Sequence, residues 1–321
     1  MRPEVFVTRR LPALALEELS QSCQVDMWDH ESPPPPYETI VARTRDKEGL
    51  LCLLTDRIDA ALMDAAPGLK VISQCAVGYD NIDIQAARAR HIAVGNTPGV
   101  LTEATADFAF ALLMASARRI GEAIDYVRNG DWKTWGLTIL LGQDVHRATL
   151  GIVGMGRIGQ ALARRAEGFE MRVLYSDVAR QPSLEARLGV EYAAFDDLLQ
   201  QADFVSLHVN LTPQTTGLIG SRELALMKQN AILINTSRGQ VVDPQALYQA
   251  LKSGRIAGAA LDVTDPEPLP PDHRLLSLPN LIVAPHIASA TESTRGRMAL
   301  MAVHNLIAGL EGNPLPNPVS G

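Results

Sequence analysis

One segment, residues 149–177, limits the possible folds of this chain more than any other. It begins TLGIVGMGRIG, with an apolar strand at 150–153 that leads into a glycine-rich turn. A helix follows, and a second apolar strand at 172–175 ends just before an acidic residue. A strand, a helix and a second strand in this order predict a parallel crossover, which needs helices on both faces of its sheet.

The turn itself, Gly154-Met155-Gly156-Arg157-Ile158-Gly159, matches the pattern of a dinucleotide site. Gly154 permits a tight turn, Gly156 lets the backbone approach a pyrophosphate, and Gly159 lets helix and strand pack closely. The start of the helix offers free N–H groups and a partial positive charge to phosphates. We therefore expect a dinucleotide cofactor here.

The acidic residue Asp177 indicates which dinucleotide is bound. Its carboxylate can accept hydrogen bonds from the adenine-ribose diol and would repel a 2′-phosphate, so NAD is favoured over NADP. Arg180 follows three residues later and could reach a 2′-phosphate. That neighbour leaves the strictness of the preference open.

The chain around this segment also alternates strands and helices. Its 321 residues are enough for about two domains. Strands are expected at 4–8, 24–28, 49–54, 71–74 and 92–95, with helices at 14–20 and 37–44. This alternation predicts an α/β fold. A helix at 103–119, apolar nearly all round, is expected between domains or at a dimer contact, and another at 297–310 precedes a proline-rich tail.

Composition excludes several classes of function. A net charge of −7 argues against a nucleic-acid partner, although local positive groups can still bind a small anion. Cys23, Cys52 and Cys75 are far apart and lack CxxC spacing, so we expect reduced thiols and no metal site. The apolar stretch 108–117 is too short to span a membrane. With no signal peptide at the N-terminus, these features predict a cytoplasmic protein.

Three later strands each end in chemically useful side chains. The strand at 231–235 leads into Thr236, Ser237 and Arg238, the strand at 257–261 into Asp262 and later Glu267, and the strand at 281–284 into His286. In open α/β sheets, ligands bind outside the carboxyl ends of the strands. These side chains are therefore expected to converge beside the cofactor.

Their chemistry fits the reduction of a 2-keto acid. His286 can supply the proton because imidazole titrates near neutral pH. Glu267 can hold the other ring nitrogen, and Arg238 can clamp a carboxylate bidentately. Taken singly, each has a plainer explanation: a surface ion pair for Arg238, a solvated carboxylate for Glu267, a core or capping residue for His286. Their joint placement after the dinucleotide turn favours the catalytic explanation.

The whole chain also resembles the D-isomer-specific 2-hydroxyacid dehydrogenases, and within them the glyoxylate/hydroxypyruvate reductases. The resemblance rests on motifs that follow in order at matching spacing: QCAVGYDNID (74–83), NTPGVLTEATADFAFALL (96–113), WKTW (132–135), GIVGMGRIGQALA (151–163), INTSRGQVVD (234–243), ALDVTDPEP (260–268) and APHIASAT (284–291).

The resemblance implies two doubly wound, Rossmann-like parallel-sheet domains. Residues 1–99 and 289–321 would form a discontinuous substrate domain, and 100–288 the NAD-binding domain, in a homodimer. It implies Arg238, Glu267 and His286 as the catalytic set. Further contacts implied with the cofactor are those of Thr105, Thr236, Ser237, Asp262 and Ala288. Those implied with the substrate are the backbone N–H groups of Val77 and Gly78, and the side chains of Trp135 and Ser289.

One departure bears on the cofactor, and several alternatives stay open. Many NADPH-using glyoxylate reductases that resemble this chain lack an acid at the Asp177 position. The chain could also be a D-lactate, phenylpyruvate or phosphite dehydrogenase of the same family. A NAD-sensing, corepressor-like binding protein is the alternative from a different class.

Overall fold

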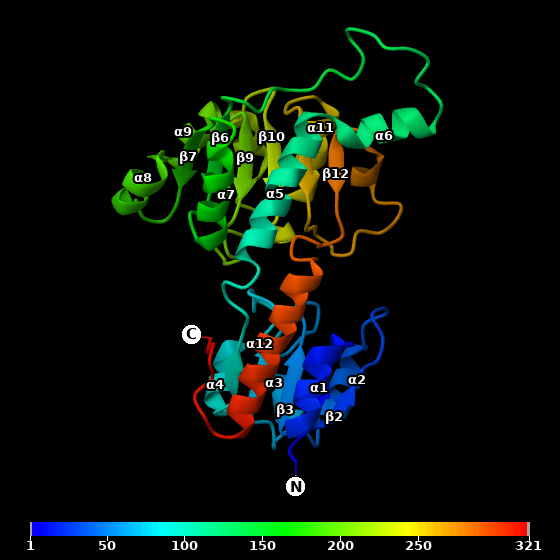
Figure 1. Ribbon diagram of the computed structural model, residues 1–321, viewed down its shortest axis with the longest axis vertical. Helices are drawn as coiled ribbons and strands as arrows, with labels where there is room; N and C mark the ends of the chain where they lie inside the picture. Colours follow the sequence, from blue (N-terminus) through cyan, green and yellow to red (C-terminus); the bar gives the residue numbers. More distant parts are fainter. Residues whose placement is uncertain (1, 320–321) are drawn as a thin grey trace. The chain divides into compact units, whose positions relative to one another are not determined.

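The computed structural model describes residues 2–319. The chain forms two compact units, unit 1 from Met1–Leu101 with Ala290–Gly321, and unit 2 from Thr102–Ser289. Each unit contains one parallel sheet (Figure 1). The expected fold class, two doubly wound domains of which one is discontinuous, is confirmed. The domain boundaries expected after residues 99 and 288 stay predictions.

The sheet of unit 1 has five parallel strands in the order β2-β1-β3-β4-β5. The order reverses at β1, which makes the sheet doubly wound. In register, the last two strands pair Ser73 with Gly95, so the residues that follow them leave the same edge of the sheet. The strands are β1 (Glu4–Val7), β2 (Gln24–Met27), β3 (Gly49–Cys52), β4 (Val71–Gln74) and β5 (Ala93–Gly95).

Helices cover both faces of this sheet because the strands are apolar on both sides. Val5 and Val7 pack with the buried residues of α1 and α12, whereas Phe6 packs with those of α2 and α3. Asp59 and Asp83 cap α3 and α4 by accepting backbone N–H bonds. The helices are α1 (Ala13–Ser22), α2 (Tyr37–Thr44), α3 (Ala60–Ala65), α4 (Ile84–Ala89) and α12 (Glu292–Leu310).

The sheet of unit 2 has seven parallel strands in the order β12-β11-β10-β9-β6-β7-β8. The order reverses at β6, which carries the glycine-rich turn at its carboxyl end, and such a switch point is where α/β sheets bind ligands. The strands are β6 (Thr149–Val153), β7 (Arg172–Ser176), β8 (Glu191–Tyr192), β9 (Phe204–Leu207), β10 (Ile232–Asn235), β11 (Gly258–Leu261) and β12 (Leu281–Val283).

Unit 2 has a hydrophobic core on each face of its sheet. Leu150 and Ile152 pack with α5 and α7 on one face, and Val153 packs with α9 to α11 on the other. The helices are α5 (Thr102–Ala117), α6 (Ile120–Arg128), α7 (Arg157–Glu167), α8 (Pro182–Leu188), α9 (Phe195–Gln201), α10 (Ser221–Leu226) and α11 (Pro244–Lys252), with short 3-10 turns at Gly239–Val241 and Arg274–Ser277.

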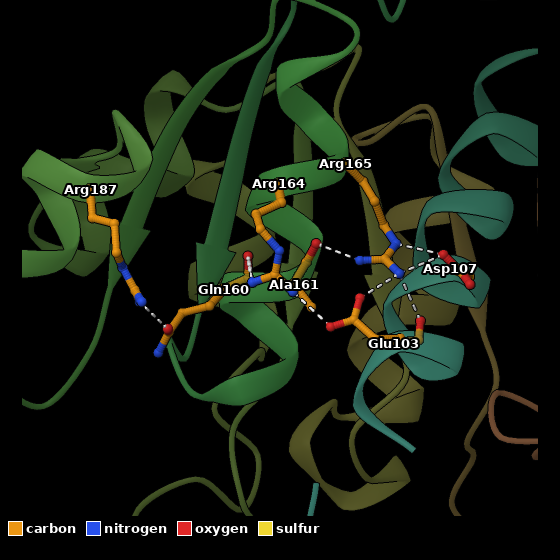
Figure 2. Close-up of polar contacts among 7 residues, drawn as sticks. All are labelled: Glu103, Asp107, Gln160, Ala161, Arg164, Arg165 and Arg187. Carbon is orange, nitrogen blue, oxygen red and sulfur yellow. Dashed lines mark hydrogen bonds and ion pairs between the residues drawn. The ribbon is translucent and has the colours of Figure 1, made fainter. Parts of the chain in front are cut away.

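Helix α5 packs along α7, and ion pairs border this contact. Arg165 reaches Asp107 and Glu103, and Arg164 reaches Glu103 (Figure 2). Exposed pairs of this kind stabilise little individually. The apolar side of α5 buries Ala109 and Leu113 in the core. The apolar side of α5 therefore holds this helix against the core, while its exposed Glu103 and Asp107 carry the ion pairs to α7.

Two helices differ from the sequence-based expectation. The helix expected at 103–119 ends at Ala117, because Arg119 adopts a left-handed conformation with φ of 52°, and the separate helix α6 follows. Helix α12 starts at Glu292 rather than 297, since the Thr291 side chain caps it by accepting from the N–H of Thr294.

Candidate active site

The turn between β6 and α7 depends on two glycines for protein contacts. Gly154 has φ of +95°, and a Cβ there would lie 2.7 Å from the carbonyl oxygen of His208. A Cβ on Gly159 would lie 2.3 Å from the carbonyl oxygen of Gly154. Side chains at either position would push β6, β9 and α7 apart, so both glycines are needed to form the turn.

Gly156 is different, because no protein contact requires a glycine there. Its φ is −73°, and a Cβ would meet no other protein atom within 4 Å. It is the N-cap of α7, yet no side chain caps that helix. The lack of a side chain therefore serves the approach of something other than protein to the helix N-terminus. A pyrophosphate fits this requirement, so the residues present fit a dinucleotide.

The other residues of the turn take separate positions. Met155 is fully buried in the core, Ile158 is half-buried against it, and Arg157 is exposed. His208, at the end of β9 behind the turn, was not singled out from the sequence. Burial lowers the pKa of His208 to about 4, and its Nε2 lies 2.8 Å from Oγ of Ser206. It is therefore a neutral supporting residue.

Asp177 follows β7 and is bonded to the glycine-rich turn. One carboxylate oxygen accepts from the N–H of Met155 at 2.8 Å, and the other from the N–H of Val178 at 2.7 Å. These bonds fix the carboxylate beside the turn. Arg180 makes two bonds of 2.8 Å to the carboxylate of Glu185, so its guanidinium is already paired.

His286 lies in a strained turn after β12. Its φ of 55° is in the left-handed region, where a non-glycine residue needs support from its surroundings. Asp262, which follows β11, gives that support. Its carbonyl oxygen accepts from the N–H of His286 at 2.9 Å, and its buried carboxylate accepts from the N–H groups of Ile287 and Ala288, both at 2.8 Å.

Glu267 and His286 form a close pair within unit 2. Nδ1 of His286 lies 2.6 Å from Oε1 of Glu267, and the other carboxylate oxygen accepts from the N–H of Thr264 at 3.2 Å. Partial burial works to raise the pKa of Glu267, but the bond with His286 and the positive charges of His286 and Arg238 outweigh it, so this pKa is lowered. An ionised Glu267 suits a protonated His286 as its partner.

Arg238 lies on a loop that is held by hydrogen bonds to the buried side chain of Asn235. The buried amide of Asn235 donates to the carbonyl of Arg238 at 2.8 Å and accepts from the N–H and hydroxyl of Ser237 at 3.0 and 2.8 Å. A Cβ on Gly239 would lie 1.9 Å from the carbonyl oxygen of Thr264. This close approach brings the Arg238 loop against the Glu267 loop. Glu267 and His286 are thus in contact, and Arg238 lies on the loop next to that of Glu267.

The remaining predicted residues of unit 2 vary in burial. Thr105 and Thr236 are buried, and the Thr236 hydroxyl is one of two buried side-chain oxygens without a hydrogen-bond partner among residues 2–319. Ala288 is buried in the turn described above, and Ser289 is half-buried. Trp135, expected at the substrate, is 78% exposed. Its indole is therefore not part of a pocket formed by unit 2 alone.

In unit 1, Val77 and Gly78 lie in the loop that follows β4. Their carbonyl oxygens accept side-chain bonds from Asn96 and Gln74, respectively. Both amides, like Asn235, stand within motifs of the sequence but carried no assigned role. Each follows or ends an apolar strand, which is the signal that could have found them.

Residues 2–319 contain no group of three or more His, Cys, Asp or Glu side chains that could hold a metal ion. No helix in this range is long and apolar enough to cross a bilayer.

Comparison with known proteins identifies the family. The family described as "D-isomer specific 2-hydroxyacid dehydrogenase, NAD binding domain" matches residues 110–288. A glyoxylate reductase of Korarchaeum cryptofilum is 56% identical over 321 residues, which cover 100% of this chain and 96% of that protein. The chain belongs to the D-isomer-specific 2-hydroxyacid dehydrogenases. The glycine-rich turn, Asp177 and the three predicted catalytic residues all lie within the matched NAD binding domain.

Solved structures similar to this chain agree with this assignment. A Thermus thermophilus protein superimposes with a TM-score of 0.93 at 50% identity, covering 99% of this chain and 100% of that one. An NADPH-dependent glyoxylate/hydroxypyruvate reductase from Sinorhizobium meliloti, in complex with NADP and malonate, has a TM-score of 0.88 at 34% identity and covers 100% and 97%. This reductase, which is similar to the chain over almost its full length, is therefore seen with NADP bound.

Proposed function

We propose that this dehydrogenase is a NAD-dependent glyoxylate/hydroxypyruvate reductase. The observation that carries the proposal is the 2.6 Å contact between Glu267 and His286 beside the Arg238 loop, all within the NAD binding domain. Relatives named glyoxylate reductase, 45–56% identical, support the substrate class.

The proposed reaction adds a hydride to C2 of the keto acid and a proton to its carbonyl oxygen. NADH, when bound, supplies the hydride. His286 donates the proton from Nε2, since its Nδ1 faces Glu267. The ionised Glu267 orients the ring and stabilises its positive charge before transfer. In the reverse direction, the neutral imidazole accepts the proton from the 2-hydroxyl group.

Substrate recognition uses positive and N–H groups. Arg238 binds the substrate carboxylate, because a guanidinium matches a carboxylate bidentately. The backbone N–H groups of Val77 and Gly78 are further proposed donors to that carboxylate. Ser289 and Trp135 remain proposed substrate contacts. A substrate held mainly by its carboxylate and carbonyl can be as small as glyoxylate.

The proposed cofactor site combines the turn 154–159 with Asp177, Thr105, Thr236, Ser237, Asp262 and Ala288. Asp177 favours NAD because its fixed carboxylate would repel a 2′-phosphate. The ion pair of Arg180 with Glu185 supports this preference, since that guanidinium is engaged. Asp262 and Ala288 would contribute to the cofactor site by shaping the turn that carries His286, in which the Ala288 N–H donates to the Asp262 carboxylate.

The two compact units support a proposed assignment of one domain to the substrate and one to the cofactor. We assign the substrate domain to residues 1–99 and 289–321, and the cofactor domain to 100–288. A cytoplasmic location is proposed as well, supported by the free thiols of Cys23, Cys52 and Cys75.

A homodimer is the proposed assembly. Helix α6 buries none of its residues, yet Ile120, Ile124 and Val127 lie on one face of it. The segment after α6 adds five more exposed apolar side chains, those of Trp132, Trp135, Leu137, Ile139 and Leu141. A second copy of this chain is the fitting occupant, because exposed apolar side chains in such number are typical of a self-complementary interface.

An initial-rate panel tests the proposed function. Glyoxylate, hydroxypyruvate, pyruvate, phenylpyruvate and 2-ketogluconate are each supplied with NADH and with NADPH. The proposal predicts the highest kcat/KM for glyoxylate or hydroxypyruvate with NADH. A preference for pyruvate or phenylpyruvate would make the chain a D-lactate or phenylpyruvate dehydrogenase instead. NAD binding without turnover on any keto acid would indicate a corepressor-like role.

A further inference from the structure

The loop after β4 is held by its carbonyl groups. Three successive carbonyl oxygens, those of residues 76–78, each accept a hydrogen bond from a different donor. The donors are the N–H of Thr97 to Ala76 at 2.9 Å, Nδ2 of Asn96 to Val77 at 2.7 Å, and Nε2 of Gln74 to Gly78 at 3.1 Å.

Fixing a carbonyl also fixes the N–H of the next residue. The two groups of a trans peptide point in opposite directions from one rigid plane, and the cis bonds within residues 2–319 all precede proline. The bonds above therefore direct the N–H groups of Val77, Gly78 and Tyr79 away from their anchors. None of these three N–H groups has an acceptor among residues 2–319. The loop thus presents donors that the described protein does not use.

The backbone of Asn96 is itself held by two hydrogen bonds. It follows β5, is almost fully buried, and its N–H donates to the carbonyl of Asn317 at 3.1 Å. Its carbonyl accepts from Nδ2 of Asn305, a fully buried residue of α12, at 2.8 Å. Oδ1 of Asn305 in turn accepts from the N–H of Asn317 at 2.9 Å. The donor to Val77 therefore has little freedom to turn away.

Gln74 is equally constrained. It is the last residue of β4 and fully buried. Its Oε1 accepts from the Cys52 thiol at 3.1 Å, and its Nε2 also donates to Oδ1 of Asn81 at 2.7 Å. The Asn81 amide donates to the carbonyls of Leu53 and Asp56. The network leaves the Gln74 amide one orientation, the one that reaches Gly78.

We propose that Asn96 and Gln74 are positioning residues that aim the N–H groups of the 76–79 loop at the substrate carboxylate. This rests on the proposed function, in which the N–H groups of Val77 and Gly78 bind that carboxylate. Asn96 fixes the peptide that carries the Gly78 N–H, and Gln74 fixes the next peptide, whose Tyr79 N–H is added here as a third donor. Both amides are buried, so they act through the loop. Losing either donor frees one peptide plane to rotate. The weakened contact is made with the substrate both before and during reaction, so KM rises while kcat is maintained.

Two variants and one matched control test the proposal in the full-length enzyme. Asn96→Ala and Gln74→Met remove the two donors. Ser73→Ala is the control, because Ser73 is the buried neighbour of Gln74 on β4 and its hydroxyl bonds Ala302 rather than the loop, at 2.7 Å. Asn96→Asp, which keeps the side-chain size, replaces Asn96→Ala if the latter melts early. We measure KM for glyoxylate, KM for NADH, kcat, and Kd for oxalate by calorimetry with NADH present.

The expected result is a rise of about tenfold in KM for glyoxylate and in Kd for oxalate, the scale of one hydrogen bond to a charged group. KM for NADH and kcat should stay within about twofold, and Ser73→Ala should match the parent. Folded variants with unchanged oxalate and glyoxylate binding would overturn the proposal, and so would an equal loss in Ser73→Ala. Oxalate binding separates the two claims: a parent that binds oxalate but reduces no keto acid contradicts only the proposed function.

Discussion

The Nδ1 atom of His286 lies 2.6 Å from Oε1 of Glu267, although the two residues leave the sheet from different strands. The backbone of His286 is left-handed, with φ of 55°, and Asp262 bonds to three successive N–H groups of its turn. The three bonds to Asp262 thus hold the backbone of His286 in a strained conformation in which its imidazole lies against the Glu267 carboxylate. This arrangement is the basis of the proposed proton transfer.

Replacing Glu267 by Gln should change the pH dependence of reduction. Gln keeps the size but cannot stabilise the imidazolium, so the alkaline limb of kcat/KM should move to lower pH. Stability gives a second readout. Because the pKa of Glu267 is lowered below its ordinary 4.5, its contribution is complete above about pH 4.5 and lost as pH falls through the folded-state pKa. The Glu267→Gln variant should not show this loss of stability at acid pH. If the alkaline limb of its kcat/KM profile stayed at the pH of the parent, the pairing of Glu267 with His286 would be contradicted.

Two glycine substitutions in one turn should have opposite outcomes. Gly156→Ala should leave thermal stability close to the parent, since its Cβ meets no protein atom, but raise Kd for NADH about tenfold. Gly159→Ala should destabilise the enzyme by about 1–3 kcal/mol, because its Cβ would overlap the Gly154 carbonyl. Thermal unfolding and NADH fluorescence titration measure both effects. Unchanged NADH affinity in Gly156→Ala would argue against a phosphate at α7.

Asp177→Ala should narrow the preference for NADH over NADPH by about tenfold or more, because the carboxylate that repels a 2′-phosphate is gone. The ratio of kcat/KM for the two cofactors, with glyoxylate fixed, is the measurement. Arg180→Ala is the matched control and should leave the ratio largely unchanged, since Arg180 is paired with Glu185. If only the control altered the ratio, Asp177 would not be the discriminating residue.

Charge on α6 should split the proposed dimer. Ile124→Asp with Val127→Asp places two carboxylates on side chains that are 44% and 55% exposed, so the fold should persist while the interface fails. Sedimentation analysis at micromolar concentration should give half the parent mass. Asn129→Asp adds charge on the same segment, away from this face, and should leave the mass unchanged. A parent already monomeric would refute the dimer.

Much of the fold followed from strand periodicity and turn chemistry. The strands around the glycine-rich turn were predicted to within a residue or two, since buried parallel strands are near-continuous apolar runs. Helix α6 was not predicted, although Ile120, Ile124 and Val127 repeat at helical spacing and are the signal that could have found it. The early start of α12 depends on the Thr291 cap, which follows a loop without hydrophobic periodicity.

The candidate site was predictable in its residues but not in its supports. Arg238, Glu267 and His286 follow strand ends, and parallel topology brings such ends together. The left-handed turn of His286 has no local signal, because it exists only through tertiary bonds to Asp262. The roles of Asn96, Gln74 and Asn235 depend likewise on which carbonyl groups the fold places beside them.

The most direct test of the account is the kcat of His286→Ala for glyoxylate reduction with NADH. We predict a loss of at least about a hundredfold, the scale of a lost general acid, while Kd for NADH stays within about twofold of the parent. Near-normal turnover in this variant would contradict the assignment of His286 as proton donor.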